Sequence, residues 1–350
     1  MTRAKTQRTS SGTRRAGWRG LLALGGALCG MAAGQALAAP KTHAPAHAAS
    51  QAPASLAGDE ALRARYALPH SHFALIEGEP VHYVDEGRGP VILLVHGSFA
   101  SLRQWDDWAR VLSRQYRVIR YDQSPAGLSG PSPTGDYTLE HKLKVIDALM
   151  DRLGVARFTI VGTSSGGLPV GAYAAQRPQR VRAVVLSNIA AGPLKVDPST
   201  FPPAVVAALE EDRKHPDHHV PEYWRQVMLM NMVDTARVTP GLAQQWTDMN
   251  NRILKVPGAM PAILAAARAD GFDRAPADLA RIKAPTLLLW SDQDHEVPLA
   301  KDGQLALAAL TVKDKALVVV PQCGHMMPLD CPGRSLDLAL PFLHRVAGGR

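Results

Sequence analysis

The sequence lacks the short motifs by which many enzymes hold nucleotides and metals. No glycine-rich phosphate loop and no dinucleotide-binding fingerprint occurs in its 350 residues. His215, His218 and His219 stand close together, but they lie on a proline-broken stretch with no fourth ligand in sight, which favours a solvated loop over a metal site. We therefore expect no metal and no other cofactor.

Excess basic charge is also missing once the N-terminus is set aside. The chain has 39 lysines and arginines against 31 acidic residues, and six of the basic ones lie in residues 1–20, which contain no acid. Without those six, 33 basic residues face 31 acidic ones. No basic patch interleaved with aromatic residues occurs, so the sequence gives no reason to expect a nucleic-acid partner.

Residues 1–38 have the order of a secretory signal peptide. A basic segment comes first, an apolar run follows from Leu21 to about Ala33, and a small-x-small site stands at Ala36 to Ala38. The apolar run is too short for a comfortable membrane span. We expect cleavage near Ala38, a secreted or periplasmic protein, and no stable membrane anchor. The export route, general or twin-arginine, stays open.

Cysteine is scarce. Cys29 lies in the leader with no lipobox before it, which leaves Cys323 and Cys331. In an oxidising compartment these two could form a disulfide bond that holds the loop around His325. Two reduced, buried thiols fit the spacing equally well, because spacing does not show the geometry that a bridge needs.

After residues 39–70, which are rich in Pro, Ala, His and Ser and predict a disordered linker, the pattern becomes regular. Short apolar runs alternate with amphipathic segments, and continuously apolar strands are typical of a sheet covered on both faces. The pattern predicts strands near 73–76, 81–84, 91–95, 116–121, 158–161, 181–186, 286–290 and 316–320, and helices near 104–113, 138–153, 168–176 and 334–346.

This alternation predicts an α/β fold with a mainly parallel sheet and helices on both faces. Residues 71–190 and 277–350 are expected to form that core. Residues 191–276 have a largely helical composition without strand signals, and we expect them to form a helical lid inserted into the core.

The turn from Gly162 to Gly166 is the strongest local signal. It reads Gly-Thr-Ser-Ser-Gly and joins an expected buried strand to an expected helix. In such a turn the central serine is exposed on a sharp corner, and the flanking positions must be very small. Ser164 is therefore the candidate nucleophile; Ser165 is not, because Thr163 occupies its own minus-two position. On the pentapeptide alone, an inert turn remains possible.

Two further residues follow strand ends, where parallel sheets place ligands and catalytic groups. Asp294 comes after the strand 286–290, and His325 comes after the strand 316–320. A serine hydroxyl needs a base to take its proton and a carboxylate to orient that base. The order Ser164, Asp294, His325 supplies a nucleophile, an orienting acid and a base.

Together four motifs make residues 73–346 resemble the α/β-hydrolase superfamily, in its serine-nucleophile, lid-bearing, esterase-like branch. They are His96-Gly97-Ser98, the turn Gly162–Gly166, the Trp-Ser-x-x-Asp-x-x-Val-Pro segment 290–298, and Gly324-His325. Ser291 stands where the family usually has a glycine. The spacing to Val297-Pro298 favours Asp294 over the rival acids Asp292 and Glu296, and the alternative acid position after the sixth strand reads Ser187-Asn188, without a carboxylate.

The resemblance implies further roles. The backbone amides of Ser98 and Ser165 would form an oxyanion hole. His96 would shape its loop rather than act as a base, and Asp122, in a loop similar to a structural loop of the family, would form a turn.

Apolar residues of the expected lid predict the character of the substrate. They are Tyr223, Trp224, Met228, Met230, Met232, Trp246 and Met249. Of these, Trp224, Met228 and Met232, together with Phe99, are our candidates for substrate binding. Ordinary helix packing is an equally good interpretation. If these residues line a pocket, the acyl or alcohol part of the substrate is apolar and uncharged.

The expected function is that of a secreted serine hydrolase that cleaves carboxylic esters of small apolar substrates through an acyl-enzyme. Relatives with other chemistry differ at the site: haloalkane dehalogenases have an aspartate as nucleophile, and proline iminopeptidases have a Gly-Gly-Pro-Gly oxyanion loop. Carbon–carbon bond hydrolysis, perhydrolysis or acyl transfer on the same triad is the alternative. A catalytically silent ligand-binding protein is another.

Overall fold

The structure is a computed structural model that describes residues 59–193 and 197–348. The expected signal peptide at 1–38, and residues 39–58 of the expected linker, lie outside the described residues. Within the described ranges, no helix is both long enough and apolar enough to cross a membrane.

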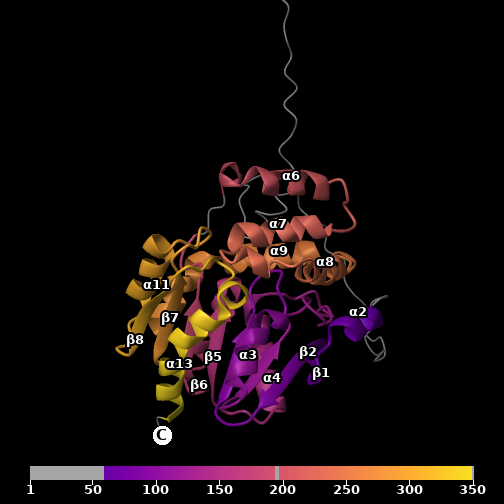
Figure 1. Ribbon diagram of the computed structural model, residues 1–350. Coiled ribbons are helices and arrows are strands. Elements are labelled where there is room, and N and C mark those ends of the chain that lie inside the picture. The colour runs from indigo at the N-terminus through magenta and orange to yellow at the C-terminus, as the bar shows by residue number, and fades with distance from the viewer. Residues whose placement is uncertain (1–58, 194–196, 349–350) are drawn as a thin grey trace, which may run out of the picture.

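The described chain forms one sheet of eight strands with helices on both faces (Figure 1). The strands are β1 (Ser71–Ile76), β2 (Glu79–Gly87), β3 (Val91–Val95), β4 (Arg117–Tyr121), β5 (Phe158–Thr163), β6 (Val181–Ser187), β7 (Thr286–Ser291) and β8 (Lys315–Val320). Their order is β1-β2-β4-β3-β5-β6-β7-β8. The hairpin β1–β2 and the pair β2–β4 are antiparallel, and the other neighbouring pairs are parallel. The predicted fold class is confirmed.

The helices of the core lie between these strands in the sequence or, for the last two, after β8. They are α3 (Asp106–Leu112), α4 (Leu139–Arg152), α5 (Gly167–Gln176), α10 (Ala275–Arg281), α11 (Gln304–Ala309), α12 (Met327–Asp330) and α13 (Pro332–Gly348). Single turns occur at η1 (Leu102–Trp105), η2 (Ser164–Gly166), η5 (Phe272–Arg274) and η6 (Leu299–Gly303). Thr138 caps α4, since its side chain accepts a hydrogen bond from the amide of His141.

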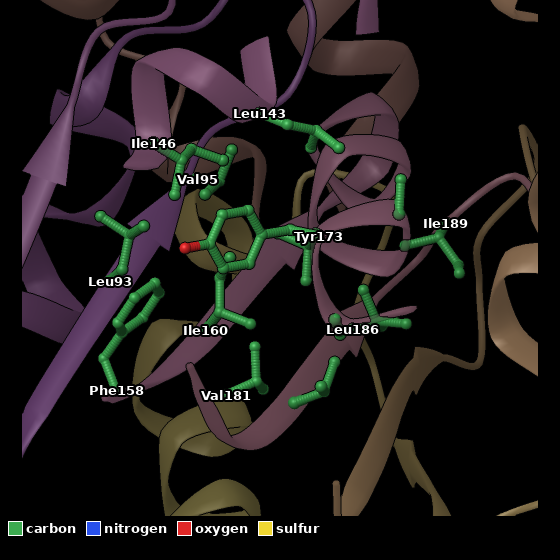
Figure 2. Packing of buried hydrophobic residues seen from close by; sticks show 14 of the residues in the cluster. Leu93, Val95, Leu143, Ile146, Phe158, Ile160, Tyr173, Val181, Leu186 and Ile189 are labelled. Atoms are coloured by element: carbon green, nitrogen blue, oxygen red, sulfur yellow. The ribbon is translucent and has the colours of Figure 1, made fainter. Parts of the chain in front are cut away.

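The central strands are continuously apolar because each one contributes side chains to the hydrophobic clusters on both faces of the sheet. On β3, Leu93 and Val95 pack into the cluster under α4 and α5, whereas Ile92 and Leu94 face the cluster under α3 and α13. Alternate side chains of a strand point to opposite faces, so both sets are buried. Figure 2 shows the first cluster, with the ring of Tyr173 among side chains of β3, β5 and α4.

Between β6 and β7 the chain forms a helical insertion. It comprises η3 (Pro198–Thr200), α6 (Pro203–Asp212), α7 (Pro221–Asn231), η4 (Thr235–Arg237), α8 (Pro240–Leu254) and α9 (Ala259–Asp270). These helices lie together above one edge of the sheet (Figure 1). Prolines begin α6, α7 and α8, at the position where a missing N–H costs nothing. The domain boundaries and the opening of this insertion as a lid stay predictions.

The expectation of a disordered linker up to residue 70 is wrong for its last part. Residues Asp59–Tyr66 form the helix α2. Its first residue makes a two-point ion pair with Arg252 of α8, at 2.6 and 3.0 Å, and both side chains are buried. Tyr66 donates a hydrogen bond to Asp248, also on α8. The polar composition of this segment did not predict a helix. The helix is stabilised by contacts with residues almost 200 positions away in the sequence, which a local pattern does not show.

Asp59→Asn is expected to lower the free energy of unfolding by about 3 kcal/mol, because Arg252 would keep its buried charge without a counter-charge. Urea unfolding followed by tryptophan fluorescence measures the change. Asp314→Asn is the control, since Asp314 and its partner Arg345 are both well exposed and such pairs contribute little. Equal stability of Asp59→Asn and the wild type would contradict the docking of α2.

Candidate active site

The turn after β5 holds Ser164 in a conformation that few residues adopt. Ser164 has a φ of +51°, and strain of this kind collects at functional sites. The glycine at 166 is required, because a Cβ there would lie 2.4 Å from the carbonyl oxygen of His96. A Cβ at Gly162 would lie 2.7 Å from the carbonyl oxygen of Gly166. The turn is therefore pressed against the loop after β3, and the serine side chain is left facing a pocket.

The structure brings the three candidate catalytic residues together. The Ser164 Oγ lies 2.9 Å from the His325 Nε2. On the other side of the imidazole, Nδ1 lies 2.8 Å from the Asp294 Oδ2. The three residues follow β5, β7 and β8, which end at the same edge of the sheet. This is the geometry by which a serine hydroxyl can pass its proton to an oriented histidine.

The three acids after β7, Asp292, Asp294 and Glu296, contact different atoms. Asp294 is fixed in place because its Oδ1 accepts hydrogen bonds from the amides of Glu296 and Val297, both at 2.9 Å. Asp292 instead accepts a hydrogen bond from the amide of Cys323, at 3.1 Å. Among the three carboxylates, Asp294 is thus the one that reaches Nδ1 of His325.

Glu296 approaches His325 from the opposite side. Its Oε2 lies 3.2 Å from Nε2, the same nitrogen that faces Ser164. Asn231, the last residue of α7, also hydrogen-bonds to this carboxylate. Sequence reasoning considered Glu296 only as a rival to Asp294, because a linear pattern does not tell which side of an imidazole a carboxylate will reach.

The two carboxylates change the proton affinity of the histidine. Burial by itself would lower the pKa of His325, but the charges of Asp294 and Glu296 outweigh it and raise the pKa to about 9. Burial also raises the pKa of Glu296, against the opposing effect of the His325 charge. With a pKa of about 9, His325 carries the proton at neutral pH and Glu296 lies beside it.

Asn188 is a second residue whose position the sequence did not reveal. It directly follows β6, and its side-chain amide donates hydrogen bonds to the Ser291 Oγ at 2.9 Å and to the His325 carbonyl oxygen at 2.9 Å. Its Oδ1 accepts a hydrogen bond from the amide of Ser291. Asn188 thus ties the end of β7 to the histidine loop. The only signal in the sequence was its place directly after a strand.

Ser98 and Ser165 lie side by side, as an oxyanion hole requires. The Ser98 Oγ donates a hydrogen bond of 2.8 Å to the Ser165 Oγ. A Cβ at Gly97 would lie 3.1 Å from the Ser164 Cβ, so this loop runs directly past the candidate nucleophile. The role of the two backbone amides as oxyanion donors stays a prediction.

His96 and Asp122 hold loops in place. The His96 Nδ1 bonds to the carbonyl oxygen of Gly97, and its Nε2 accepts from the amide of Gln123. Burial lowers the pKa of His96. Asp122 accepts hydrogen bonds from the amides of Leu102 and Leu128, at 2.6 and 2.7 Å. Both residues are satisfied locally and neither faces Ser164.

A largely apolar pocket opens beside Ser164 and His325, between the loop after β3 and the helical insertion. It is lined by Gly97, Ser98, Phe99, Gln104, Ser164, Tyr223, Trp224, Val227, Met230, Asn231, Trp246, Glu296, His325 and Met326. Asn250 of α8 fixes one wall, since it donates a hydrogen bond of 2.9 Å to the carbonyl oxygen of Phe99.

Two of the four expected substrate contacts need correction. Phe99 and Trp224 line the pocket. Met228 and Met232 do not; they are buried in the apolar cluster of the insertion. The helical period of 3.6 residues explains this, because Val227 and Met230 share the face of α7 that looks onto the pocket whereas Met228 points to the neighbouring face.

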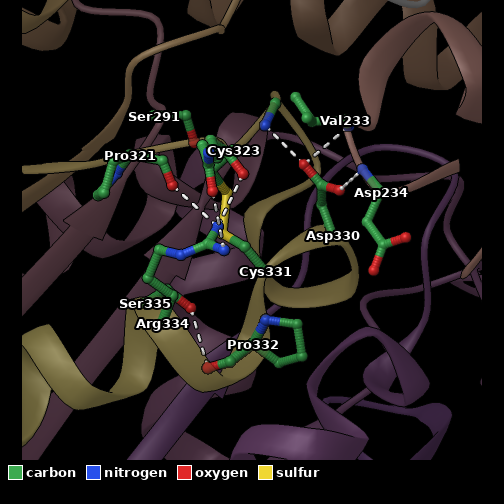
Figure 3. The surroundings of a disulfide bond; sticks show 12 residues. Val233, Asp234, Ser291, Pro321, Cys323, Asp330, Cys331, Pro332, Arg334 and Ser335 are labelled. Carbon is green, nitrogen blue, oxygen red and sulfur yellow. Dashed lines mark hydrogen bonds between the residues drawn. A yellow bond between two sulfur atoms is a disulfide. The ribbon is translucent and has the colours of Figure 1, made fainter.

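The loop with His325 is tied to its surroundings at several points (Figure 3). The structure joins Cys323 to Cys331 through their sulfur atoms, with the two Cα atoms 5.8 Å apart. Asp330 accepts hydrogen bonds from the amides of Gly324, Val233 and Asp234. It therefore connects the histidine loop to the end of α7 in the insertion.

The histidines at 215, 218 and 219 are not grouped around a common point. His218 pairs with Asp217, and His219 pairs with Asp212. Within residues 59–193 and 197–348, no group of three or more His, Cys, Asp or Glu side chains could hold a metal ion.

Fold and site together define a class of protein, an α/β protein with a serine, histidine and aspartate at the carboxyl edge of a parallel sheet. A family profile described as alpha/beta hydrolase fold matches residues 90–332. The chain belongs to this family.

The relatives that match the chain are hydrolases. A 2-hydroxy-6-oxo-6-phenylhexa-2,4-dienoate hydrolase of Comamonas testosteroni is 26% identical over 273 residues, which cover 76% of this chain and 91% of that protein. Haloalkane dehalogenase 2 of Mycobacterium tuberculosis is 29% identical over 272 residues, covering 73% and 88%. The structure of a thermophilic esterase from Thermogutta terrifontis superposes with a TM-score of 0.62 at 24% identity, covering 79% and 99%. This last likeness shows the shared fold, and the sequence relatives support a hydrolase activity.

A titration of the histidines by NMR will test the charge around His325. We expect its imidazole to titrate with a pKa of about 9, and Glu296→Gln to lower that pKa because one of the two neighbouring negative charges is lost. The signal is assigned by its disappearance in His325→Gln. An unchanged pKa in Glu296→Gln would contradict the pairing of Glu296 with Nε2.

The Cys323–Cys331 bond is tested by thiol titration of the denatured, non-reduced protein, prepared without residues 1–38 so that Cys29 is absent. We expect no free thiol. The paired change Cys323→Ser with Cys331→Ser should lower the free energy of unfolding by about 2–3 kcal/mol, because the bond closes a loop of only a few residues. Two free thiols in the wild type would show that the bond does not form.

Proposed function

We propose that the protein is a secreted serine hydrolase that cleaves carboxylic esters with an apolar acyl part. The observation that carries this proposal is the chain of hydrogen bonds from Ser164 through His325 to Asp294, opening on an apolar pocket. Secretion is supported by the N-terminal leader in the sequence, and N-terminal sequencing of the exported protein would test it.

In the proposed reaction His325 takes the hydroxyl proton of Ser164 as the oxygen attacks the ester carbonyl. Asp294 keeps Nδ1 protonated, so that Nε2 is the basic nitrogen. The amides of Ser98 and Ser165 receive the negative charge that develops on the carbonyl oxygen. His325 then returns the proton to the leaving alcohol, and a water molecule, activated in the same way, releases the acid from Ser164.

The pocket favours esters over the substrates of the carbon–carbon hydrolases among the relatives. The substrate named for the Comamonas enzyme is a dienoate, which is an acid. In the part of the chain that the structure describes, no lysine or arginine lines the pocket, and Glu296 adds a negative charge. A buried anion without a partner is costly. Carbon–carbon hydrolysis, perhydrolysis and acyl transfer remain the alternative on the same triad.

Ser164→Ala is expected to lower kcat/KM for p-nitrophenyl butyrate by about 10³-fold or more, because the nucleophile is lost while the pocket stays intact. A fluorophosphonate probe should label the wild type at the peptide containing Ser164 and leave the variant unlabelled. Ser199→Ala, on an exposed turn of the insertion, is the control and should behave as the wild type. Equal rates in Ser164→Ala and the wild type would refute the assignment.

A further inference from the structure

The candidate active site contains one carboxylate more than its chemistry requires. Two titratable side chains line the pocket, those of His325 and Glu296. The side chain of Glu296 is only 18% exposed. A mostly buried carboxylate next to the candidate catalytic residues points to a functional role, because burying an uncompensated charge costs free energy.

The position of Glu296 places it beside the alcohol part of a bound ester. His325 Nε2 must give its proton to the leaving oxygen, so that oxygen has to lie within hydrogen-bond distance of Nε2. Glu296 Oε2 is itself 3.2 Å from Nε2. Substituents close to the leaving oxygen are therefore held near the carboxylate, whereas the acyl part extends away from Nε2.

Two more carboxylates lie behind the imidazole. Asp294 contacts its other nitrogen, and Asp302 of η6 interacts electrostatically with Asp294. Asp292, directly after β7, and Asp330, on the histidine loop, each accept a hydrogen bond from a backbone amide. The nearby cation Lys301 is more than half exposed and lies 3.4 Å from Asp302. α7 contributes Asn231, which is uncharged.

Other walls of the pocket are aromatic. Phe99, Tyr223 and Trp246 each pack against Trp224, with ring centroids 4.8 to 5.6 Å apart. The faces of such rings attract cations, most strongly where water is excluded. A carboxylate beside aromatic rings is thus chemically matched to an ammonium group.

We infer that Glu296 is a specificity-determining residue that makes the site prefer esters whose alcohol part carries a positive charge, such as a quaternary ammonium. Neutral esters bind less well, and esters with an anionic alcohol part are rejected. This inference rests on the proposed ester hydrolase function. It narrows that function, since the acyl part stays apolar and the charge belongs to the alcohol.

Matched esters isolate the effect of charge. Choline butyrate and 3,3-dimethylbutyl butyrate have nearly the same shape and differ by one positive charge, and replacing a terminal methyl of the latter by carboxylate gives an anionic member. The three are compared by kcat/KM on the alkaline plateau of the rate profile, where His325 has lost its proton. We expect the choline ester to be preferred over the neutral ester by about tenfold or more, and the anionic ester to be the poorest substrate.

Glu296→Gln keeps the size of the side chain and removes its charge. In this variant we expect the ratio between the choline and neutral esters to fall to within about twofold of unity, since the paired charges are gone. Glu222→Gln removes an exposed acid of α7 that does not line the pocket, and it should keep the wild-type ratio. A wild-type ratio near unity, or a ratio that survives in Glu296→Gln, would overturn the inference.

A binding measurement covers the case in which Glu296→Gln turns over slowly. Tetramethylammonium should slow the labelling of Ser164 by an uncharged fluorophosphonate in the wild type and fail to do so in Glu296→Gln. Protection that is the same in both proteins would again overturn the inference. If no ester is hydrolysed and Ser164 is not labelled at all, the proposed function itself is wrong; hydrolysis without charge preference refutes only the role of Glu296.

Discussion

The site depends on one hydrogen bond, that between the Ser164 Oγ and the His325 Nε2. The two residues are 161 positions apart in the sequence, so only the sheet can bring them together. β5 and β8 run parallel with β6 and β7 between them, and parallel strands present their carboxyl ends at one edge. Every loop that contributes to the reaction starts from that edge.

These loops lack regular structure and are held instead by buried carboxylates that bind backbone amides. Asp122 fixes the segments after β3 and β4, Asp294 fixes its own turn, and Asp330 joins the histidine loop to the end of α7. A buried amide without a partner would be costly. The same bonds therefore stabilise the fold and position the candidate catalytic groups, and they connect the helical insertion to the loop that holds His325.

The charges of the site favour one protonation state over another. His325 stands between Asp294 and Glu296, and both stabilise the imidazolium. In the proposed ester cleavage an imidazolium forms at each proton transfer, so the two carboxylates would stabilise the transition state. They also keep His325 protonated in the free enzyme, so it must lose that proton before it can act as a base. The same negative charge faces a pocket without lysine or arginine among its lining residues, and we propose that it discriminates among substrates.

The sequence by itself determined the fold class, because continuously apolar strands at β3, β5 and β7 can only be buried on both faces. It also predicted that Ser164, Asp294 and His325 act together, and the structure brings these three side chains into contact; the glycines of the turn and the positions after strands are local properties. It did not reveal α2, the bridging by Asn188, or the place of Glu296, and it misassigned Met228 and Met232. These features depend on which neighbour each side chain contacts, and the packing of segments distant in sequence decides those contacts.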